Sequence, residues 1–434
     1  MTEKAAVIAS DCRVRLDAIW RLESGRILAA VMRIVRDLAV AEELVQDASV
    51  RALETWAERG VPENPAAWLM TTAKNRAIDT LRRQASYSGI QRQLGEEMQS
   101  QTAADAVETA AEETVDDDML RLMFTVCHPL LSPEARVALA LRLVNGLSVA
   151  EIARAYLVPE ATIFQRITRA KRTLKAAHVA FELPRTEHRG ERLQSVLEAV
   201  YLIFNEGYAA TTGEQWLRPA LCEEALRLAR SLASLVSDNG EVLGLAALLE
   251  FQTSRFAARV GSDGSPILLQ QQDRARWDRL LIHRGGVYLE KAFSCHQPVG
   301  AYCIQAAIAG CHARAPNWEE TDWEEIAALY NGLLQAHPSP VVELNRAVAI
   351  GMADGPGAGL KIVEDLIGRG QLSSYHLLYS VWGDLLSKLG RLGEARSAFQ
   401  RAAGLTRNRQ EISLMQRRAS ECVETSNLSG GDAH

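Results

Sequence analysis

Long apolar runs, paired cysteines and an excess of positive charge are all missing from this 434-residue sequence. No uninterrupted apolar run approaches the roughly 18 residues of a membrane span. The opening MTEKAAVIASDCRVRLD lacks the apolar centre of a secretory signal. We therefore expect no membrane contact and a cytoplasmic location. The seven cysteines are scattered and odd in number, which suits reduced thiols rather than a disulfide framework.

Metal-site and catalytic patterns are scarce as well. Cys295, Cys303 and Cys311 recur at a spacing that matches no common ligand pattern, so we interpret them as buried helical thiols. The segment DGPGAG (354–359) is glycine-rich, but it follows a helical pattern and lacks the Lys-Ser/Thr pair of a phosphate-binding loop. No nucleophile and base occur at a recognisable spacing. The sequence predicts neither a cofactor nor an enzyme.

Alternating β-branched segments are also missing, while apolar residues recur at helical spacing throughout. This periodicity predicts an all-α fold. The first helices are expected at 13–36, 38–58 and 65–85. Asp37 would cap the second helix, and Asn64-Pro65 would open the third.

Shifts in composition divide the chain into segments. Residues 95–118 hold nine acidic and no basic residues, which indicates a flexible, self-repelling linker. We expect a helical domain at 10–90, this linker at 91–118, a second helical domain at 119–180, a helical extension at 181–422 and a disordered tail at 423–434. The polar segment FELPRTEHRG (181–190) would act as a hinge before the extension.

Positive charge is concentrated in LSVAEIARAYLVPEATIFQRITRAKRTLK (147–175), which has six Lys or Arg and two acids in a chain of net charge −6. Ser148 and Glu151 form the capping-box pattern of a helix start, and Pro159 suits the first turn of a second helix. On that second helix the residues expected to face inward are Ile163, Ile167, Ala170 and Leu174. Those expected on the opposite side are Thr162, Gln165, Arg169 and Arg172, flanked by Arg166.

This pattern predicts a helix-turn-helix whose second helix enters the major groove of DNA. Arg and Gln read base edges there, and the other cations contact phosphates. The alternative is a solvated amphipathic hairpin. The agreement of cap, turn, apolar stripe and charge favours DNA binding.

A repeat is legible near the C-terminus, in VWGDLLSKLGRLGEARSAFQRAAG. Its small and apolar positions follow tetratricopeptide spacing: Gly383, Leu386, Gly390, Ala395, Phe399 and Ala402. An imperfect copy precedes it at 344–366, so we expect tetratricopeptide-like repeats near 341–405. Such hairpins stack into surfaces that bind protein partners. The alternative is an ordinary helical hairpin.

Two segments resemble a known family. DLAVAEELVQDASVRALETW (37–56) followed by PAAWLMTTAKNRAIDTLRR (65–83) resembles region 2 of bacterial sigma-70-type factors. LSPEARVALALRLVNGLSVAEIARAYLVPEATIFQRITRAKRTLK (131–175) resembles their region 4. The short separation of the two blocks is similar to the extracytoplasmic-function (ECF) group. The extension, with YLIFNEGYAA and GAYCIQAAIAGCHA, resembles the ECF branch that carries a long tetratricopeptide-like C-terminal extension and depends on it for activity.

The resemblance implies a transcription initiation factor that binds core RNA polymerase and promoter DNA. Matched positions would dock on the β′ clamp helices of polymerase: Asp37, Glu42, Glu43, Gln46 and Asp47. Others would engage the −10 element: Trp68, Lys74, Asn75, Arg76, Arg82 and Arg83. The −35 element would go to Thr162, Gln165, Arg166, Arg169, Lys171 and Arg172. Region 4 would also meet the β flap of polymerase, and the extension would offer a surface to a further protein partner.

Residues 68–83 carry four cations against Asp79 alone, which suits a strand whose bases have left the duplex. Trp68 begins an amphipathic helix, so a core position is favoured over a stacking platform. Two positions depart from the family pattern and leave the promoter sequence open: Leu157 stands where Gly is frequent, and Phe164 stands where Lys or Arg is common. The alternative function is a helix-turn-helix regulator with repeats that never replaces a sigma subunit, and the region 2 motif argues against it.

Overall fold

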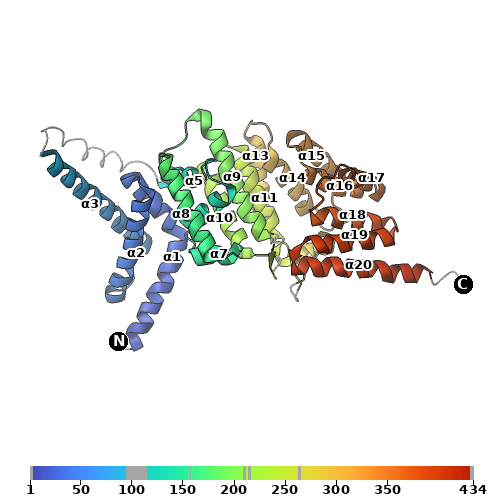
Figure 1. The fold of residues 1–434 in the computed structure, drawn as a ribbon, viewed down its shortest axis with the longest axis horizontal. Helices are drawn as coiled ribbons and strands as arrows, with labels where there is room; N and C mark the ends of the chain where they lie inside the picture. The colour runs from blue at the N-terminus through green and yellow to red at the C-terminus, as the bar shows by residue number, and fades with distance from the viewer. Residues whose placement is uncertain are drawn as a thin grey trace. The chain divides into compact units, whose positions relative to one another are not determined.

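The computed structural model describes residues 3–93, 115–156, 158–208, 212–213, 217–261 and 265–430, and helices dominate these ranges (Figure 1). The all-α prediction is confirmed; the strands are the two-residue β1 (Thr212–Gly213) and β2 (Arg407–Asn408), paired in parallel. The chain divides into two compact units, an N-terminal unit (Met1–Val200) and a C-terminal unit (Tyr201–His434).

The N-terminal unit is built from three long helices followed by shorter ones. These are α1 (Glu3–Val35), α2 (Leu38–Arg59), α3 (Pro65–Gln93), α5 (Val115–Val126), α6 (Pro133–Leu139), the π-helical η1 (Ala140–Val144), α7 (Val149–Tyr156), α8 (Glu160–Ala176) and the first part of α9 (Thr186–Tyr208). Both predicted N-terminal caps are confirmed. The Asp37 carboxylate accepts hydrogen bonds from the backbone of Ala39 and Val40, and the Asn64 side chain accepts one from Ala67.

A helical core joins α1, α2 and α3. Ile27, Trp56 and Leu69 contribute one large apolar side chain from each helix, and all three are almost fully buried. Along α2 the remaining buried residues are small or aliphatic and recur at helical spacing. The opposite, polar side of α2 is thereby turned outward from this three-helix core.

The predicted linker and hinge are shorter than expected. The linker was expected at 91–118, but α3 continues to Gln93 and α5 begins at Val115. Both ends of the expected linker are therefore helical, and residues 94–114 lie outside the described ranges. Asp118 is 1% exposed and pairs with Arg121 at 3.1 Å. The acidic run therefore ends in a first helical turn, where negative charge is favourable. The hinge expected at 181–190 is helical from Thr186.

The boundary between the two compact units falls inside α9, well after the predicted domain boundary at 180. Arg136 of α6 explains why the start of α9 belongs with the N-terminal unit. Its guanidinium is buried. It donates to the Glu198 carboxylate at 2.7 Å and to the Ser195 carbonyl at 3.5 Å. Arg192 of α9 donates to the Phe124 carbonyl at 2.7 Å. These contacts hold the first turns of α9 against α5 and α6.

The C-terminal unit continues from the end of α9. Its other helices are α10 (Pro219–Leu235), α11 (Gly240–Ser254), α12 (Phe256–Arg259), η2 (Leu269–Gln271), η3 (Arg274–Arg276), α13 (Arg279–Ser294), α14 (Ala301–Arg314), α15 (Trp323–Ala336), α16 (Pro340–Ala353), α17 (Pro356–Gly368), α18 (His376–Lys388), α19 (Leu392–Leu405) and α20 (Arg409–Gly430). α11 is buried nearly all round and packs against α10, α13 and α14. Its Glu250 is fully buried and is neutralised by the Arg230 guanidinium through two hydrogen bonds of 2.7 and 2.9 Å.

Small residues let the last helices approach closely, as the repeat pattern requires. A Cβ on Gly383 of α18 would lie 2.7 Å from the Phe399 ring of α19, and one on Gly359 would lie 2.4 Å from the Ala347 carbonyl. Gly390 adopts a positive φ of 74° just after α18. α18, α19 and α20 lie side by side in Figure 1. The pairing into hairpins agrees with the spacing, while the tetratricopeptide assignment itself stays a prediction.

The disordered tail expected at 423–434 is corrected for most of its length, because α20 runs to Gly430. Leu414, Met415, Ala419 and Cys422 are buried along the preceding turns. Once those turns are packed, each further residue extends the helix at little cost.

Candidate nucleic-acid interface

The predicted helix-turn-helix is present in α7 and α8. The backbone N–H of Ser148 donates to the Glu151 carboxylate at 2.8 Å, and the N–H of Glu151 donates to the Ser148 hydroxyl at 3.1 Å, so the capping box is confirmed. The four apolar residues predicted to face inward on α8 are all buried: Ile163, Ile167, Ala170 and Leu174. Pro159 precedes the first turn as the N-cap residue instead of lying within it.

The outer face of α8 gathers the residues predicted to read bases. Thr162, Gln165, Arg166 and Arg169 line one side of an open pocket of about 390 Å³, whose other side is formed by Leu130, Leu131, Ser132 and Ala135. Gln165, Arg169 and Arg172 are exposed. Amide and guanidinium groups on one exposed helix face can donate to base edges and phosphates.

The two departures from the family pattern have different outcomes. Phe164 is 62% exposed on α8, so its ring is free to contact a thymine methyl group or a neighbouring protein surface. Leu157 lies outside the described residues.

α3 carries the side chains predicted for the −10 element. Ala73 and Ala77 are buried, whereas Asn75, Arg82 and Arg83 are exposed and Lys74 is half-buried. Trp68 is half-buried and its ring meets the edge of the buried Trp56 ring at 5.7 Å between centroids. This contact supports the expectation that Trp68 belongs to the core.

The acidic side of α2 faces cations of the same unit. Lys171 of α8 pairs with Glu42 at 2.5 Å, and Lys175 pairs with Asp37 at 3.1 Å. Arg76 of α3 pairs with Asp47. Glu43 and Gln46 are exposed on the same helix.

The ion pairs affect the protonation of Asp37. The hydrogen bond from Lys175 lowers the pKa of the Asp37 carboxyl below its ordinary value, and the backbone N–H of Val40 lowers it further. The structure thus brings together residues from all three predicted sets. The sequence did not predict this pairing, because opposite charges more than a hundred residues apart do not show which acid meets which cation. The contact of Lys175 was missed for the same reason.

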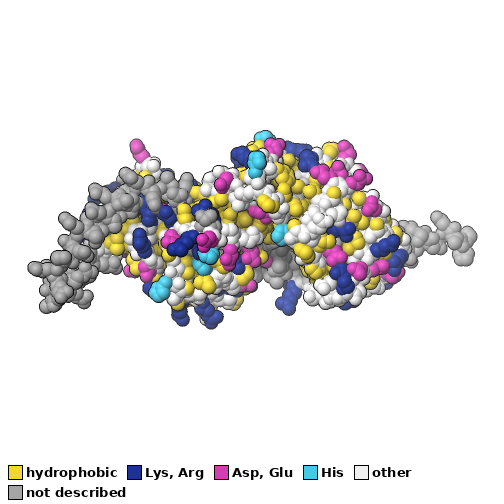
Figure 2. All heavy atoms as spheres, turned by 90° about the horizontal axis from the view of Figure 1, so that it is seen from above, with side chains coloured by type: hydrophobic (Ala, Val, Ile, Leu, Met, Phe, Trp, Pro, Cys, Tyr) yellow, Lys and Arg dark blue, Asp and Glu magenta, His cyan; other side chains and the backbone are white. Residues whose placement is uncertain are grey.

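On the face that Figure 2 shows, the described Lys and Arg side chains form no continuous positive band. They alternate there with Asp and Glu side chains among the described residues, as expected from the net charge of −6.

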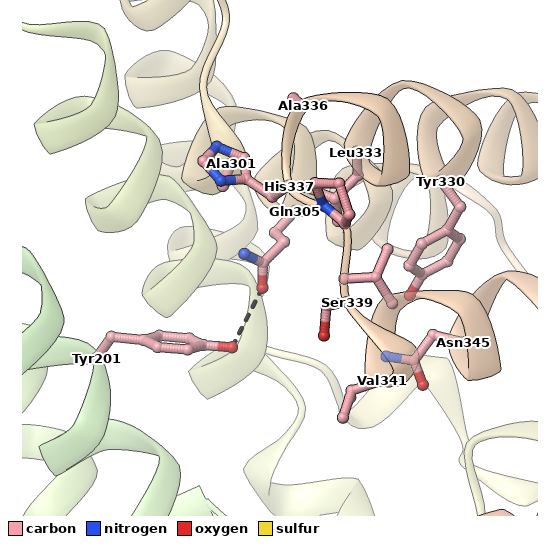
Figure 3. Close-up of a pocket in the computed structure, with 12 residues that line it drawn as sticks. Tyr201, Ala301, Gln305, Tyr330, Leu333, Ala336, His337, Ser339, Val341 and Asn345 are labelled. Atoms are coloured by element: carbon pink, nitrogen blue, oxygen red, sulfur yellow. Dashed lines mark hydrogen bonds between the residues drawn. The ribbon is translucent and has the colours of Figure 1, made fainter. Parts of the chain in front are cut away.

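The C-terminal unit has a pocket of about 470 Å³ between the end of α9 and helices α14, α15 and α16, lined by polar and apolar side chains. In Figure 3 the side chains of Tyr201 and Gln305 point toward one another, and the Tyr201 hydroxyl lies 3.1 Å from the Gln305 side-chain oxygen. Burial raises the pKa of Tyr330 to about 12, so its hydroxyl stays protonated. Together with Ser339 and Asn345, these groups can hydrogen-bond a neutral polar group, and no acidic side chain, Lys or Arg lines the pocket.

The buried cysteines of α14 are structural. Cys303 and Cys311 are buried in α14, and burial raises the pKa of both thiols to about 12. The described residues contain no group of three or more His, Cys, Asp or Glu side chains that could hold a metal ion. Within the described ranges, no helix is long and apolar enough to span a membrane.

Comparison with known proteins finds three matching families. Sigma-70 region 2 matches residues 19–87, Sigma-70 region 4 matches residues 121–174, and a family of unknown function, DUF6596, matches residues 192–293. No solved structure matches the chain.

Similar proteins cover different parts of the chain. An uncharacterized protein of Rhizobium meliloti, R00370, is 45% identical over 393 residues, which is 89% of this chain and 91% of that protein. The ECF RNA polymerase sigma factor SigL of Mycobacterium tuberculosis is 32% identical over 145 residues, 33% of this chain and 77% of SigL. The probable ECF sigma factor SigI of the same species is 25% identical over 174 residues, 40% of this chain and 59% of SigI.

Regions 2 and 4 on one chain, with a capped helix-turn-helix in the second, define a sigma-70-type factor. The chain belongs to the extracytoplasmic-function (ECF) sigma factors. It is therefore a sigma factor that directs RNA polymerase in transcription initiation, a role outside the enzyme classes, and its C-terminal unit contains a domain of unknown function.

Proposed function

We propose that α8 reads the −35 element of the promoter while α3 holds the unpaired strand of the −10 element. The observation that carries this proposal is the exposed face of α8, where Thr162, Gln165, Arg166 and Arg169 lie together above a buried apolar stripe. That arrangement suits insertion into a major groove, with base edges read by Gln and Arg. Lys171 and Arg172 would contact flanking phosphates.

The exposed cations of α3 suit a different task. Arg82 and Arg83 are exposed near Lys74 and Asn75 on one helix. Cations of this kind neutralise the backbone of a single strand, while amide groups reach extruded bases. Trp68 packs on Trp56, so we assign it to supporting the helix rather than to stacking on a base.

The polar side of α2 would dock on the β′ clamp helices of core polymerase. Glu43 and Gln46 are exposed there, and Asp37, Glu42 and Asp47 lie on the same helix or at its cap. We further propose that region 4 meets the β flap, that the protein works in the cytoplasm, and that the C-terminal unit binds a protein partner.

The test is transcription reconstituted with core polymerase from the bacterium that carries this chain, using DNA from upstream of its own gene. We expect a discrete transcript that appears only when the chain is added. A helix-turn-helix regulator would instead protect the DNA without polymerase and give no new transcript with core enzyme alone; that result would overturn the proposal.

A further inference from the structure

The pocket between the end of α9 and helices α14, α15 and α16 is large enough to hold a small molecule. Its volume of about 470 Å³ lies within the range of roughly 300–1,000 Å³ that is typical of small-molecule sites. Polar side chains share its wall with aliphatic ones, which include Leu333, Val341 and Val342. The three matching families end at residue 293, so none of them assigns a role to α14, α15 or α16.

Hydrogen-bonding groups lie on opposite sides of this pocket (Figure 3). Tyr201 and Gln305 lie on one side, Tyr330 and Asn345 on the other, and Ser339 between them. The Tyr201 hydroxyl donates to the Gln305 side-chain oxygen at 3.1 Å, which leaves the Gln305 amide nitrogen as a donor. Burial, with a further contribution from the Tyr201 phenol, raises the pKa of Tyr330 to about 12, so its hydroxyl is a donor at neutral pH. A ligand would therefore meet hydrogen-bonding groups from several directions.

The first turn of α16 adds backbone donors to the same wall. Ser339 is the N-cap residue of α16, yet its hydroxyl makes no capping hydrogen bond. Val341 and Val342 lie in the first turn and line the pocket. Backbone N–H groups at these positions have no carbonyl partner within their own helix. The hydroxyl and the two N–H groups are suited to bond oxygen atoms of a ligand.

The charge of the lining restricts the class of ligand. Among the residues that the structure describes, no Asp, Glu, Lys or Arg lines the pocket, and the lining His337 is exposed to solvent. An ionic ligand would lose its hydration there without gaining a counter-charge, which costs far more free energy than burying a hydrogen-bonded hydroxyl. The positive end of α16 offsets only a small part of that cost for an anion. The pocket therefore favours an uncharged ligand.

We propose that this pocket binds a neutral, polyhydroxylated small molecule of the sugar class. Its hydroxyl groups would bond the polar side chains on both sides, and its C–H groups would pack on the tyrosine rings and the aliphatic wall. Tyrosine suits this task because one side chain offers an apolar face and a polar tip. A fatty alcohol has a single hydroxyl and would leave most of the polar groups without a partner, which weakens binding.

Binding is tested on the full-length protein with two matched pairs of probes. The neutral probes are the methyl β-glycosides of glucose and galactose, and the charged probes are the methyl β-glycosides of glucuronic and galacturonic acid. Saturation-transfer NMR should show contact with the ring protons of a neutral probe at millimolar concentration. The same probe should raise the melting temperature, because it binds only the folded chain. Its acid should bind about tenfold more weakly, because the carboxylate finds no counter-charge.

Two results would overturn the proposal at this stage. One is the lack of saturation transfer to both neutral probes at millimolar concentration. The other is an acid that binds as tightly as its neutral counterpart, or more tightly, because the pocket would then select for negative charge.

A pair of alanine substitutions on α15 locates the bound sugar. Ala336 lines the pocket and is exposed at the end of α15, so Ala336→Trp should fill the pocket without entering the core. Ala328 is also exposed on α15 but does not line the pocket, so Ala328→Trp is the matched control. We expect Ala336→Trp to abolish saturation transfer and Ala328→Trp to bind like the wild type. Undiminished binding by Ala336→Trp would place the sugar elsewhere and defeat the proposal.

Removal of one hydroxyl tests the wall opposite Tyr201. Tyr330→Phe keeps the ring and should weaken binding about fivefold, which is the loss expected for one neutral hydrogen bond. Tyr288→Phe in α13 removes a hydroxyl outside the pocket and should leave binding unchanged. Equal affinities of the wild type and both variants would remove Tyr330 from the site and contradict the arrangement proposed here.

Ser339 separates ligand binding from helix capping. Ser339→Ala should weaken binding by a similar factor and leave the melting temperature of the free protein unchanged, because its hydroxyl does not cap α16. Asp322→Ala is the contrasting variant: the Asp322 carboxylate accepts from the Glu325 N–H at 2.8 Å and caps α15, so its loss should lower the melting temperature. A Ser339→Ala chain that melts earlier yet binds the sugar normally would make Ser339 a cap and exclude the end of α16 from the site.

Discussion

At the scale of single residues, α8 carries two arginines with different expected tasks. Arg169 lines the pocket with Thr162 and Gln165, whereas Arg172 is exposed outside it. Arg169→Ala should relax preference at one or two −35 positions and cost about 1–3 kcal/mol if the contact is bidentate. Arg172→Ala should weaken all promoters alike. The measurement is the affinity of the polymerase complex for matched and mismatched −35 duplexes; equal losses on both for Arg169→Ala would make it a phosphate contact.

His312 of α14 predicts a pH dependence in the C-terminal unit. Burial, with help from Arg255 and Arg274, lowers the pKa of His312 to about 3, and its ring contacts the rings of Trp318 and Trp323. In the unfolded chain His312 is therefore protonated near pH 6.5, whereas in the folded chain it is protonated only near pH 3. Stability from this group is complete above about pH 6.5 and is lost as the pH falls, by at most about 1.4 kcal/mol per pH unit.

Urea denaturation followed by tryptophan fluorescence between pH 7 and pH 4.5 measures this slope. His312→Phe should flatten it, because the ring packing stays while the titration is removed. His283→Phe, on the exposed side of α13, should leave the slope as in the wild type. A slope that survives His312→Phe would assign the acid sensitivity to other groups.

At the scale of single helices, Glu43 of α2 offers a direct test of polymerase docking. Glu43 is exposed and has no ion pair among the described contacts, in contrast to Glu42. Glu43→Lys reverses a charge without disturbing the contact with α8, and it should weaken association with core polymerase, which a pull-down would measure. Glu54→Lys, exposed further along α2, is the matched control. Equal binding by wild type and Glu43→Lys would remove Glu43 from the docking surface.

Helix starts were predictable because their signals are local. Asp37, Asn64 and the Ser148–Glu151 box each satisfy backbone N–H groups within three residues, and the structure confirms all three. The inward side of α8 was predictable for the same reason, since periodicity alone fixes it. The ends of α3 and α20 were not, because a helix extends wherever earlier turns are anchored.

Contacts between distant segments were beyond the sequence. No local sequence pattern predicts the ion pair of Glu42 with Lys171 or that of Arg136 with Glu198. The role of Gly25 is similar: a glycine within a helix lowers the stability of that helix, and the close approach of the Val144 carbonyl and the Met119 side chain accounts for the residue.

At the scale of the whole molecule, the boundary inside α9 changes how the extension can be removed. The sequence predicts a cut after Ala180, yet Arg136 would then lose both the Glu198 carboxylate and the Ser195 carbonyl. The cut also removes the part of α9 that covers Arg136, so the surface of α5 and α6 that α9 packs against becomes exposed to water. Leu193, Val196 and Leu197 are buried in the same stretch of α9 and would be lost as well.

We therefore expect two truncations to differ. A chain that ends after Val200 should fold, bind core polymerase and unfold cooperatively, whereas one that ends after Ala180 should have a lower melting temperature or fail to accumulate. Comparing the two separates the structural role of early α9 from the role of the C-terminal unit in transcription. Similar thermal stability of both chains would show that α9 adds nothing to the N-terminal unit.

The chain ending at Val200 then tests whether the C-terminal unit contributes to initiation. That unit makes up more than half of the protein, and the resemblance described in the sequence analysis implies that activity depends on it. The expected outcome is polymerase binding near that of the full chain with much lower reporter output from the target promoter, measured at matched cellular levels. Equal output would make the C-terminal unit dispensable, and higher output would make it inhibitory. Either result would contradict a positive role, and because the Val200 truncation keeps Arg136 paired with Glu198, neither could be attributed to a damaged DNA-binding unit.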